Sequence, residues 1–208
     1  GFIGWYMVAS GLVDRVDVSH YRLATHLVLA FIILSLIYWN YLKFKEIHSS
    51  VHKIKFLLPQ IFLLFVFLQI TIGAFVSGMD AGKIYNSWPL MGQSYFPDDN
   101  SISNLFKLSS FDDPSLVQFI HRNLAYLILL IFLYICYFVY KNNLNFFYNV
   151  IKLIGFLLLL QIILGILTLL SGAQIILASM HQISSIFLVS SSIYLIYLNS
   201  KINLQPSN

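Results

Sequence analysis

Three histidines near the starts of long apolar stretches are the residues of this sequence best suited to chemistry. Each is followed four residues later by a small side chain: His26 by Ala30, His121 by Ala125 and His181 by Ser185. Residues four apart share one face of a helix, so each imidazole has a small neighbour one turn deeper. A neutral imidazole beside room for a flat macrocycle suits haem iron, and two such helices facing each other would give bis-histidine ligation.

Two arginines accompany these histidines. Arg122 follows His121 directly, and Arg22 lies one helical turn before His26. An arginine costs about 2.5–3.5 kcal/mol at the centre of a membrane helix on insertion scales. Guanidinium groups bind carboxylates well, so we expect Arg22 and Arg122 to bind haem propionates.

Less specific explanations apply to each residue alone. A single histidine in a membrane helix often makes a hydrogen bond between helices, and an arginine at a helix end can extend to lipid phosphates. Three histidines at one depth favour a shared ligand role instead. His48 and His52 lie in a lysine-rich loop and are expected to be solvated, and His20 is expected at the interface without a role.

The elements that position these residues are membrane helices. Of the 208 residues 59% are hydrophobic and only 10% are charged, whereas soluble domains carry roughly 25% charged residues. Stretches of about 20 apolar residues are long enough to span a membrane. Five such spans are predicted, at Tyr21–Leu42, Phe56–Met79, Gln118–Tyr140, Leu153–Ser171 and Ile175–Leu198. With a half-helix at 1–12, the sequence predicts an all-α, polytopic membrane helix bundle.

Charge in the connecting segments predicts the orientation of the helices. Residues 43–55 hold four lysines and one glutamate, so this linker is expected in the cytoplasm. The net charge of +4 is explained by these topological lysines, and no nucleic-acid partner is expected. Residues 13–20, 80–117 and 172–174 are then outside. The long outer loop 80–117 is expected to contain a short interfacial helix near 101–108.

An internal repeat relates the helices. LQITIGAFVSGMDAG (68–82) matches LQIILGILTLLSGA (160–173), and GFIGWYMVASG (1–11) fits the end of the same pattern. The unit is a pair of helices, present three times, with one histidine in each pair. Gln69 and Gln161 are expected to form hydrogen bonds between helices, and Asp80 to cap a helix. Small residues let membrane helices approach closely, as expected for Gly4, Gly73 and Gly165.

At these residues the chain resembles the haem A synthase family, membrane enzymes that complete the haem of cytochrome oxidase. The resemblance runs along the whole chain in the right order. The matching stretches are GWYMVASGL (4–12), VSHYRLATHLVLA (18–30), GAFVSGMDAGKIYNSWPLM (73–91), VQFIHRNLAY (117–126), and LQIILGILTLL with LASMHQ (160–182). It implies an eight-helix bundle of two similar four-helix halves, each holding one haem between two histidines.

The resemblance also implies a division of the chain and roles for its histidines. Residues 1–42 would be the remnant of the N-terminal half, 43–55 a linker, 56–199 the C-terminal half and 200–208 a tail. His121 and His181 would be the axial ligands of a haem b cofactor. His26 would be one ligand of the site that oxidises haem O, with its partner in a segment preceding this chain. We therefore expect an N-terminally truncated chain with about five and a half of eight membrane helices.

The activity implied by the resemblance is oxidation of the C8 methyl group of haem O to a formyl group, giving haem A for cytochrome c oxidase. Two successive hydroxylations with loss of water are the usual proposal. Haem O synthase would be the partner that supplies the substrate, the electron acceptor is not identified, and a homo-oligomer is allowed. The 208 residues alone are expected to bind haem b but not to make haem A. The composition favours the bacterial inner membrane, with the mitochondrial inner membrane as the alternative.

Two other function classes fit parts of the sequence. A b-type membrane cytochrome would use the same bis-histidine ligation for electron transfer without modifying a haem. A transporter or structural bundle would use the histidines only for hydrogen bonds and would bind no haem. Neither explains the large aromatic outer loop with its NSWPLM stretch (86–91), which favours a site that admits and covers a bulky substrate.

Overall fold

The protein, described here from a computed structural model, is helical throughout the part of the chain that the structure places. The described residues are 1–11, 18–45, 53–55 and 57–201. The α-helices are α1 (Phe2–Gly11), α2 (His20–Lys43), α3 (Leu57–Gly78), α4 (Pro114–Lys141), α5 (Tyr148–Leu170) and α6 (Ile175–Ser200). Short 3-10 helices are η1 (Ala81–Lys83), η2 (Ile102–Phe106), η3 (Leu108–Asp112) and η4 (Asn145–Phe147). The predicted all-α class is confirmed.

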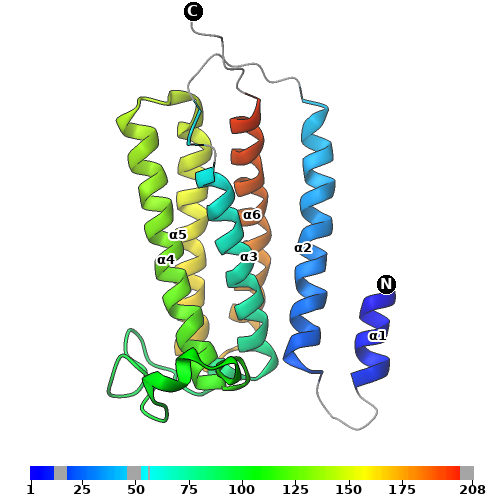
Figure 1. The fold of residues 1–208 in the computed structure, drawn as a ribbon, viewed down its shortest axis with the longest axis vertical. Helices are drawn as coiled ribbons and strands as arrows, with labels where there is room; N and C mark the ends of the chain where they lie inside the picture. Colours follow the sequence, from blue (N-terminus) through cyan, green and yellow to red (C-terminus); the bar gives the residue numbers. More distant parts are fainter. Residues whose placement is uncertain (12–17, 46–52, 56, 202–208) are drawn as a thin grey trace, which may run out of the picture.

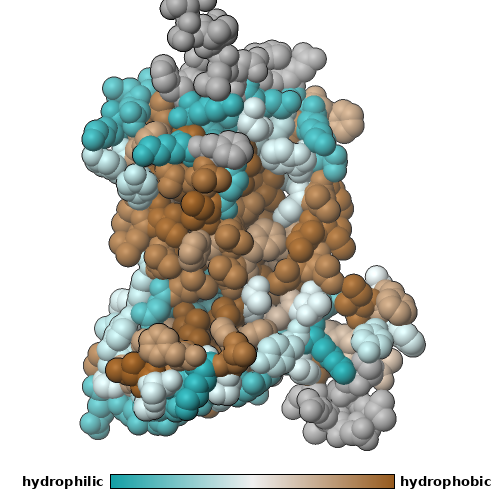
Figure 2. Space-filling view, in the orientation of Figure 1, coloured by the Kyte–Doolittle hydropathy of each residue, from teal (hydrophilic) through white to brown (hydrophobic). Residues whose placement is uncertain are grey.

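Five of these helices are long and apolar enough to cross a membrane. They match the five predicted spans. On the face shown in Figure 2, a broad hydrophobic band across the middle separates two more polar ends. α4 begins four residues before the predicted span. Its start is set by Asp113, whose side chain accepts the backbone N–H of Leu116 at 3.0 Å, and by Pro114 in the first turn. Hydropathy alone does not detect such a polar cap.

Helices α3 to α6 form a four-helix arrangement in which α4 and α6 occupy opposite corners. α3 and α5 each pack against both of them. α2 packs on α3 and α6, and α1 lies beside α2 at the end that holds the long loop (Figure 1). This end is the one that charge assigns to the outside, and α2, α4 and α6 all run away from it. A residue near the start of α4 therefore lies at the same level as one near the start of α6.

The well-packed core lies in the inner half of this arrangement. Its largest fully buried side chains include Phe62, Phe147, Ile154 and Leu195. At the outer level the packing is less complete. Every residue from 119 to 127 in α4 and from 175 to 183 in α6 remains at least partly accessible. The predicted histidines lie in this more open outer part.

The predicted interfacial helix near 101–108 appears as two consecutive 3-10 helices, η2 and η3. Phe106, the last residue of η2, is 83% exposed and Leu108, the first residue of η3, is 87% exposed, which fits a segment lying at a membrane surface. His48, His52 and residues 202–208 lie outside the described residues. The division into 1–42, 43–55, 56–199 and a tail stays a prediction.

Candidate functional site

Each of the three helix pairs of the repeat brings one glycine against one histidine ring. A Cβ atom added to Gly4 would lie 3.0 Å from Cε1 of His26, and one added to Gly73 would lie 3.1 Å from Cε1 of His121. The third pair repeats the contact, because a Cβ on Gly165 would lie 3.1 Å from Cε1 of His181. The prediction that these glycines permit close approach is therefore confirmed. Their partner is an imidazole ring, which the sequence does not reveal.

A glutamine one turn deeper than the glycine contacts the same histidine in the second and third pairs. The Nε2 atom of Gln69 donates to the backbone oxygen of His121 at 3.1 Å, and Gln161 donates likewise to that of His181 at 3.1 Å. The predicted hydrogen bonds between helices are thus confirmed. The Nε2 atoms of Gln69 and His121 also lie 3.2 Å apart.

His121 on α4 and His181 on α6 lie at similar distances from the outer ends of their helices. They stand seven residues after the start of α4 and six after the start of α6, or about 9–10.5 Å at 1.5 Å per residue. The Nδ1 atom of each ring is buried and has no hydrogen-bond partner in the described part of the chain. Because Nδ1 is buried in both rings, Nε2 is the nitrogen that could bind a haem iron, and in His121 it lies beside the amide of Gln69.

His26 occupies a different environment. It lies six residues after the start of α2 and is exposed. Its ring contacts α1 through Gly4, whereas the ring of His121 contacts Gly73 of α3 and that of His181 contacts Gly165 of α5. His26 thus rests on a different helix from His121 and His181, and its assignment to a second haem site stays a prediction.

A haem needs fewer protein ligands than a bare metal ion does. No group of three or more His, Cys, Asp or Glu residues that could hold a metal is found in the ranges the structure describes. A haem iron takes four nitrogens from its macrocycle and needs at most two from the protein. His121 and His181 are the residues that could supply these two nitrogens.

Arg122 holds the outer loop as well as lying beside His121. Its terminal nitrogens donate to the backbone oxygens of Ser87 at 2.9 Å, Tyr85 at 3.0 Å and Leu90 at 3.3 Å. Its Nε atom is buried and has no partner in the described residues. Arg22, by contrast, is half-buried and makes no hydrogen bond or ion pair with another described residue. The two arginines predicted to bind propionates are therefore not equivalent, because Arg122 already uses three of its five N–H donors on the outer loop.

Other α4 side chains fasten the same loop. Gln118 donates to the backbone oxygen of Tyr85 at 3.0 Å, one turn before Arg122. One turn after it, the hydroxyl oxygen of Tyr126 accepts from Nε1 of Trp88 at 3.0 Å. The loop that carries NSWPLM is thus attached along one face of α4, at the level of His121. Sequence reasoning missed this role, because a helix face that binds a loop through backbone oxygens has no signature in residue type.

We expect Arg122→Gln to loosen this loop. Hydrogen bonds from a charged donor contribute about 1.5–3 kcal/mol each, so amide hydrogen exchange over residues 85–92 should accelerate about ten- to a hundredfold. The measurement is exchange mass spectrometry on the full-length protein in detergent. Arg22→Gln is the matched control and should leave exchange in this loop unchanged. Equal exchange in the two variants would contradict the role assigned to Arg122.

The tip of the outer loop is closed by Asp98. Its carboxylate accepts from the hydroxyl of Ser94 at 2.6 Å and from the backbone N–H of Gln93 at 3.1 Å. The Ser94 hydroxyl, followed by the Gln93 N–H, lowers the pKa of Asp98 below its usual value. The carboxylate is therefore charged at neutral pH, and its contribution to the turn is lost only in acid.

Two minor expectations have different outcomes. Asp80 adopts a left-handed backbone with φ of 53° and makes no side-chain cap, so the capping prediction is wrong. Its carboxylate instead pairs with Lys83 at 2.8 Å, which its position beside the 3-10 turn brings within reach. His20 lies at the outer interface as expected, 3.4 Å from Asp112 of η3.

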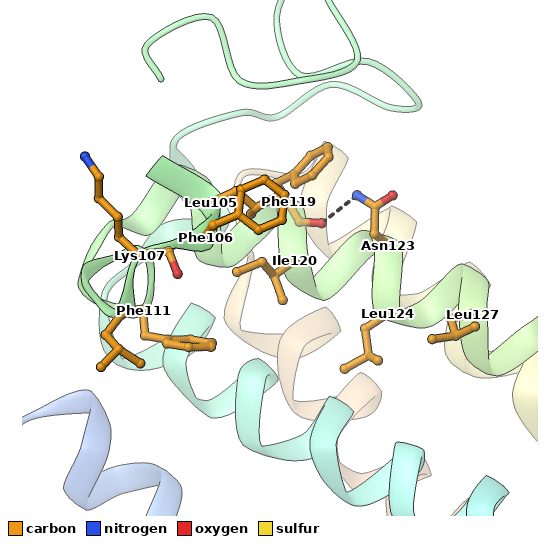
Figure 3. Close-up of a pocket in the computed structure, with 11 residues that line it drawn as sticks. Leu105, Phe106, Lys107, Phe111, Phe119, Ile120, Asn123, Leu124 and Leu127 are labelled. Atoms are coloured by element: carbon orange, nitrogen blue, oxygen red, sulfur yellow. Dashed lines mark hydrogen bonds between the residues drawn. The ribbon is translucent and has the colours of Figure 1, made fainter. Parts of the chain in front are cut away.

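An open groove of about 430 Å³ lies along the outer part of α4, beneath η2 and η3. Figure 3 shows Phe119, Ile120 and Leu124 of α4 on one side and Leu105 and Phe111 on the other. The lining is almost entirely apolar, and none of the three repeat histidines belongs to it. The groove therefore offers no ligand to a haem iron.

Comparison with known proteins connects this arrangement to a family. The sequence model of the cytochrome oxidase assembly protein family (COX15-CtaA) matches residues 1–193. The chain is 46% identical over 204 residues to the heme A synthase of Pelagibacter ubique (strain HTCC1062), covering 96% of this chain and 59% of that protein. It is 40% identical over 206 residues to the heme A synthase of Rickettsia africae (strain ESF-5), covering 95% of this chain and 60% of that protein.

A third relative, the heme A synthase of Rickettsia bellii (strain RML369-C), is 43% identical over 202 residues, which are 93% of this chain and 59% of that protein. The chain thus spans about three fifths of the length of the curated relatives it matches. No solved structure matches. The five spanning helices and the bacterial relatives support a multi-pass integral membrane protein of the bacterial inner membrane.

Proposed function

The chain belongs to the COX15-CtaA family of cytochrome oxidase assembly proteins, and from this premise we propose that it forms part of a haem A synthase. The proposed protein is an integral membrane oxidoreductase whose substrate is haem O. It oxidises the C8 methyl group of that haem to a formyl group, giving haem A for cytochrome c oxidase. The names of the relatives in Pelagibacter and Rickettsia support the assignment.

The single observation that carries the proposal is the paired placement of His121 and His181. They lie at one level on helices at opposite corners of the four-helix arrangement, each with its ring against a glycine. The accessible stretches of α4 and α6 around them leave this part of the bundle less filled than its inner half. These residues would hold a haem b cofactor as its two axial ligands.

Bound there, haem b would supply a one-electron redox centre. The residues of this chain would orient it and shield it from water. His121 and His181 would fix the two faces of the macrocycle. The loop that Arg122 attaches to α4 would cover the outer side. The guanidinium hydrogens of Arg122 that do not bond the loop are the ones that would meet a propionate.

His26 would serve the substrate site. Its ring is exposed on α2 and rests on Gly4 as the other two rings rest on their glycines. Arg22 lies one turn before it and has no partner among the described residues, which leaves its guanidinium available for a propionate of haem O. We expect the second ligand of this site, and with it the complete activity, to need residues outside the 208 of this chain.

The test is to express the full-length protein together with a source of haem O and to analyse the extracted haems by chromatography. Appearance of haem A supports the proposal. If haem O persists unchanged while the purified protein carries low-spin haem b, the protein is a b-type electron carrier and the proposed activity is wrong. The electron-carrier alternative uses the same histidine pair, so ligand geometry alone does not separate it from the synthase.

A further inference from the structure

We propose that Gln69 and Gln161 are positioning residues for the two haem ligands, each fixing the backbone of one histidine across the interface between two helices. The inference rests on the proposed haem site and adds the residues that set its geometry. Neither glutamine is a catalytic residue, because neither would touch the substrate.

The two glutamines make the same contact in two copies of the repeat. Gln69 stands four residues before Gly73 on α3, and Gln161 stands four residues before Gly165 on α5. Each donates from Nε2 to the backbone oxygen of the histidine that rests on that glycine, at 3.1 Å in both cases. Glycine and glutamine thus contact the same histidine at two points. The glycine leaves room for the imidazole ring, and the glutamine amide binds the backbone oxygen of that histidine.

A helical carbonyl oxygen has a second lone pair that can accept from a neighbouring helix without losing its own helical bond. Such a bond fixes both the height of the histidine along the bundle and the rotation of its helix. In a buried environment this hydrogen bond is strong and depends on direction, whereas the surrounding leucine and isoleucine contacts do not. The direction of an axial imidazole depends on both the height of its residue and the rotation of its helix. Groups that orient a ligand in this way commonly affect metal binding by 10–100-fold.

The two contacts differ in one respect that makes the inference testable. Gln161 also donates to Oγ of Ser184 at 2.8 Å, and that hydroxyl donates in turn to the backbone oxygen of His181 at 3.0 Å. The residue three after His121 is Leu124, which has no hydroxyl. The second amide hydrogen of Gln69 faces the His121 ring instead, with 3.2 Å between the two Nε2 atoms. Removing Gln161 therefore leaves His181 with one side-chain donor, whereas removing Gln69 leaves His121 with none.

The experiment compares Gln69→Leu, Gln161→Leu and the double variant Gln161→Leu/Ser184→Ala in the full-length protein, purified with its haem. We measure the rate of haem transfer to apomyoglobin and the largest g value of the low-spin ferric haem, which reports the mutual orientation of the imidazoles. Gln69→Leu should accelerate haem transfer about tenfold and shift the g value. Gln161→Leu should accelerate it only about threefold, and the added Ser184→Ala should bring it to the level of Gln69→Leu.

The matched control is Gln60→Leu, the same substitution on α3. Gln60 is two and a half turns deeper, and no hydrogen bond to another described residue is found for it. A purely structural effect of replacing a membrane glutamine would appear in this control, and a positioning effect would not.

Two outcomes overturn the inference in different ways. If Gln69→Leu matches Gln60→Leu in both readouts while His121→Ala and His181→Ala lose the low-spin haem, the positioning role is wrong and the haem site stands. If His121→Ala and His181→Ala keep that haem, the proposed site itself is wrong and the inference falls with it.

Discussion

Replacement of His121 or His181 by alanine is expected to remove the low-spin haem b signal from the full-length protein. Each substitution deletes one of two axial ligands, and alanine leaves no nitrogen within reach of the iron. The loss of haem affinity should exceed the roughly 10–100-fold that removal of an outer-shell partner costs. The measurement combines the absorption spectrum of the purified protein, its low-spin resonance signal and the ratio of haem to protein.

His26→Ala is the internal control for this prediction. His26 occupies the same repeat position, but its ring rests on Gly4 of α1 rather than on a glycine of α3 or α5. The variant should keep the low-spin haem b signal and lose formation of haem A. If His26→Ala removed the signal while His121→Ala kept it, the assignment of cofactor and substrate sites would have to be exchanged.

Valine in place of Gly73 or Gly165 is expected to have the second largest effect. A Cβ at either position would already lie 3.1 Å from an imidazole carbon, which is closer than most real Cβ contacts. The two further methyl groups of valine have no room on the same side. The ring must move away, and overpacking of this kind typically costs about 1–3 kcal/mol. Both the melting temperature in detergent and the haem content of the full-length protein should fall.

Gly155 provides the matched control on α5. A Cβ there would lie 3.2 Å from the ring of Phe132, so the crowding is equal but the ring is not a histidine. Gly155→Val should lower the melting temperature by a comparable amount and leave the haem spectrum unchanged. If all three variants lowered haem content equally, the glycines would matter only for stability. The specific contact between Gly73 and His121 would then have no functional meaning.

The spans and their orientation could be predicted from the sequence because they depend on local properties. A run of about 20 apolar residues must cross the bilayer whatever its neighbours are, and lysines near its ends set the direction. The same holds for the repeat, which is visible as matching strings around Gln69 and Gln161. The depth of the three histidines follows from counting residues along a helix of known rise.

The partners of those residues could not be predicted, because each lies on another helix or in a distant loop. That Gly73 meets His121, and that Gln69 holds its main chain, depends on how α3 is rotated against α4. Arg122 was assigned to a propionate on charge alone. In the fold its guanidinium reaches three backbone oxygens of the outer loop first, and backbone groups are the same at every position of a sequence.

The sequence by itself determined the class of the protein, its membrane helices, its candidate iron ligands and its resemblance to a family. Each of these follows from residue type and spacing. Only the tertiary structure decided that the helices of His121 and His181 occupy opposite corners of one bundle and that each histidine ring rests on a glycine of the preceding helix. The reason is physical. Helix pairing is set by contacts between side chains far apart in the chain, which no local pattern of residues records.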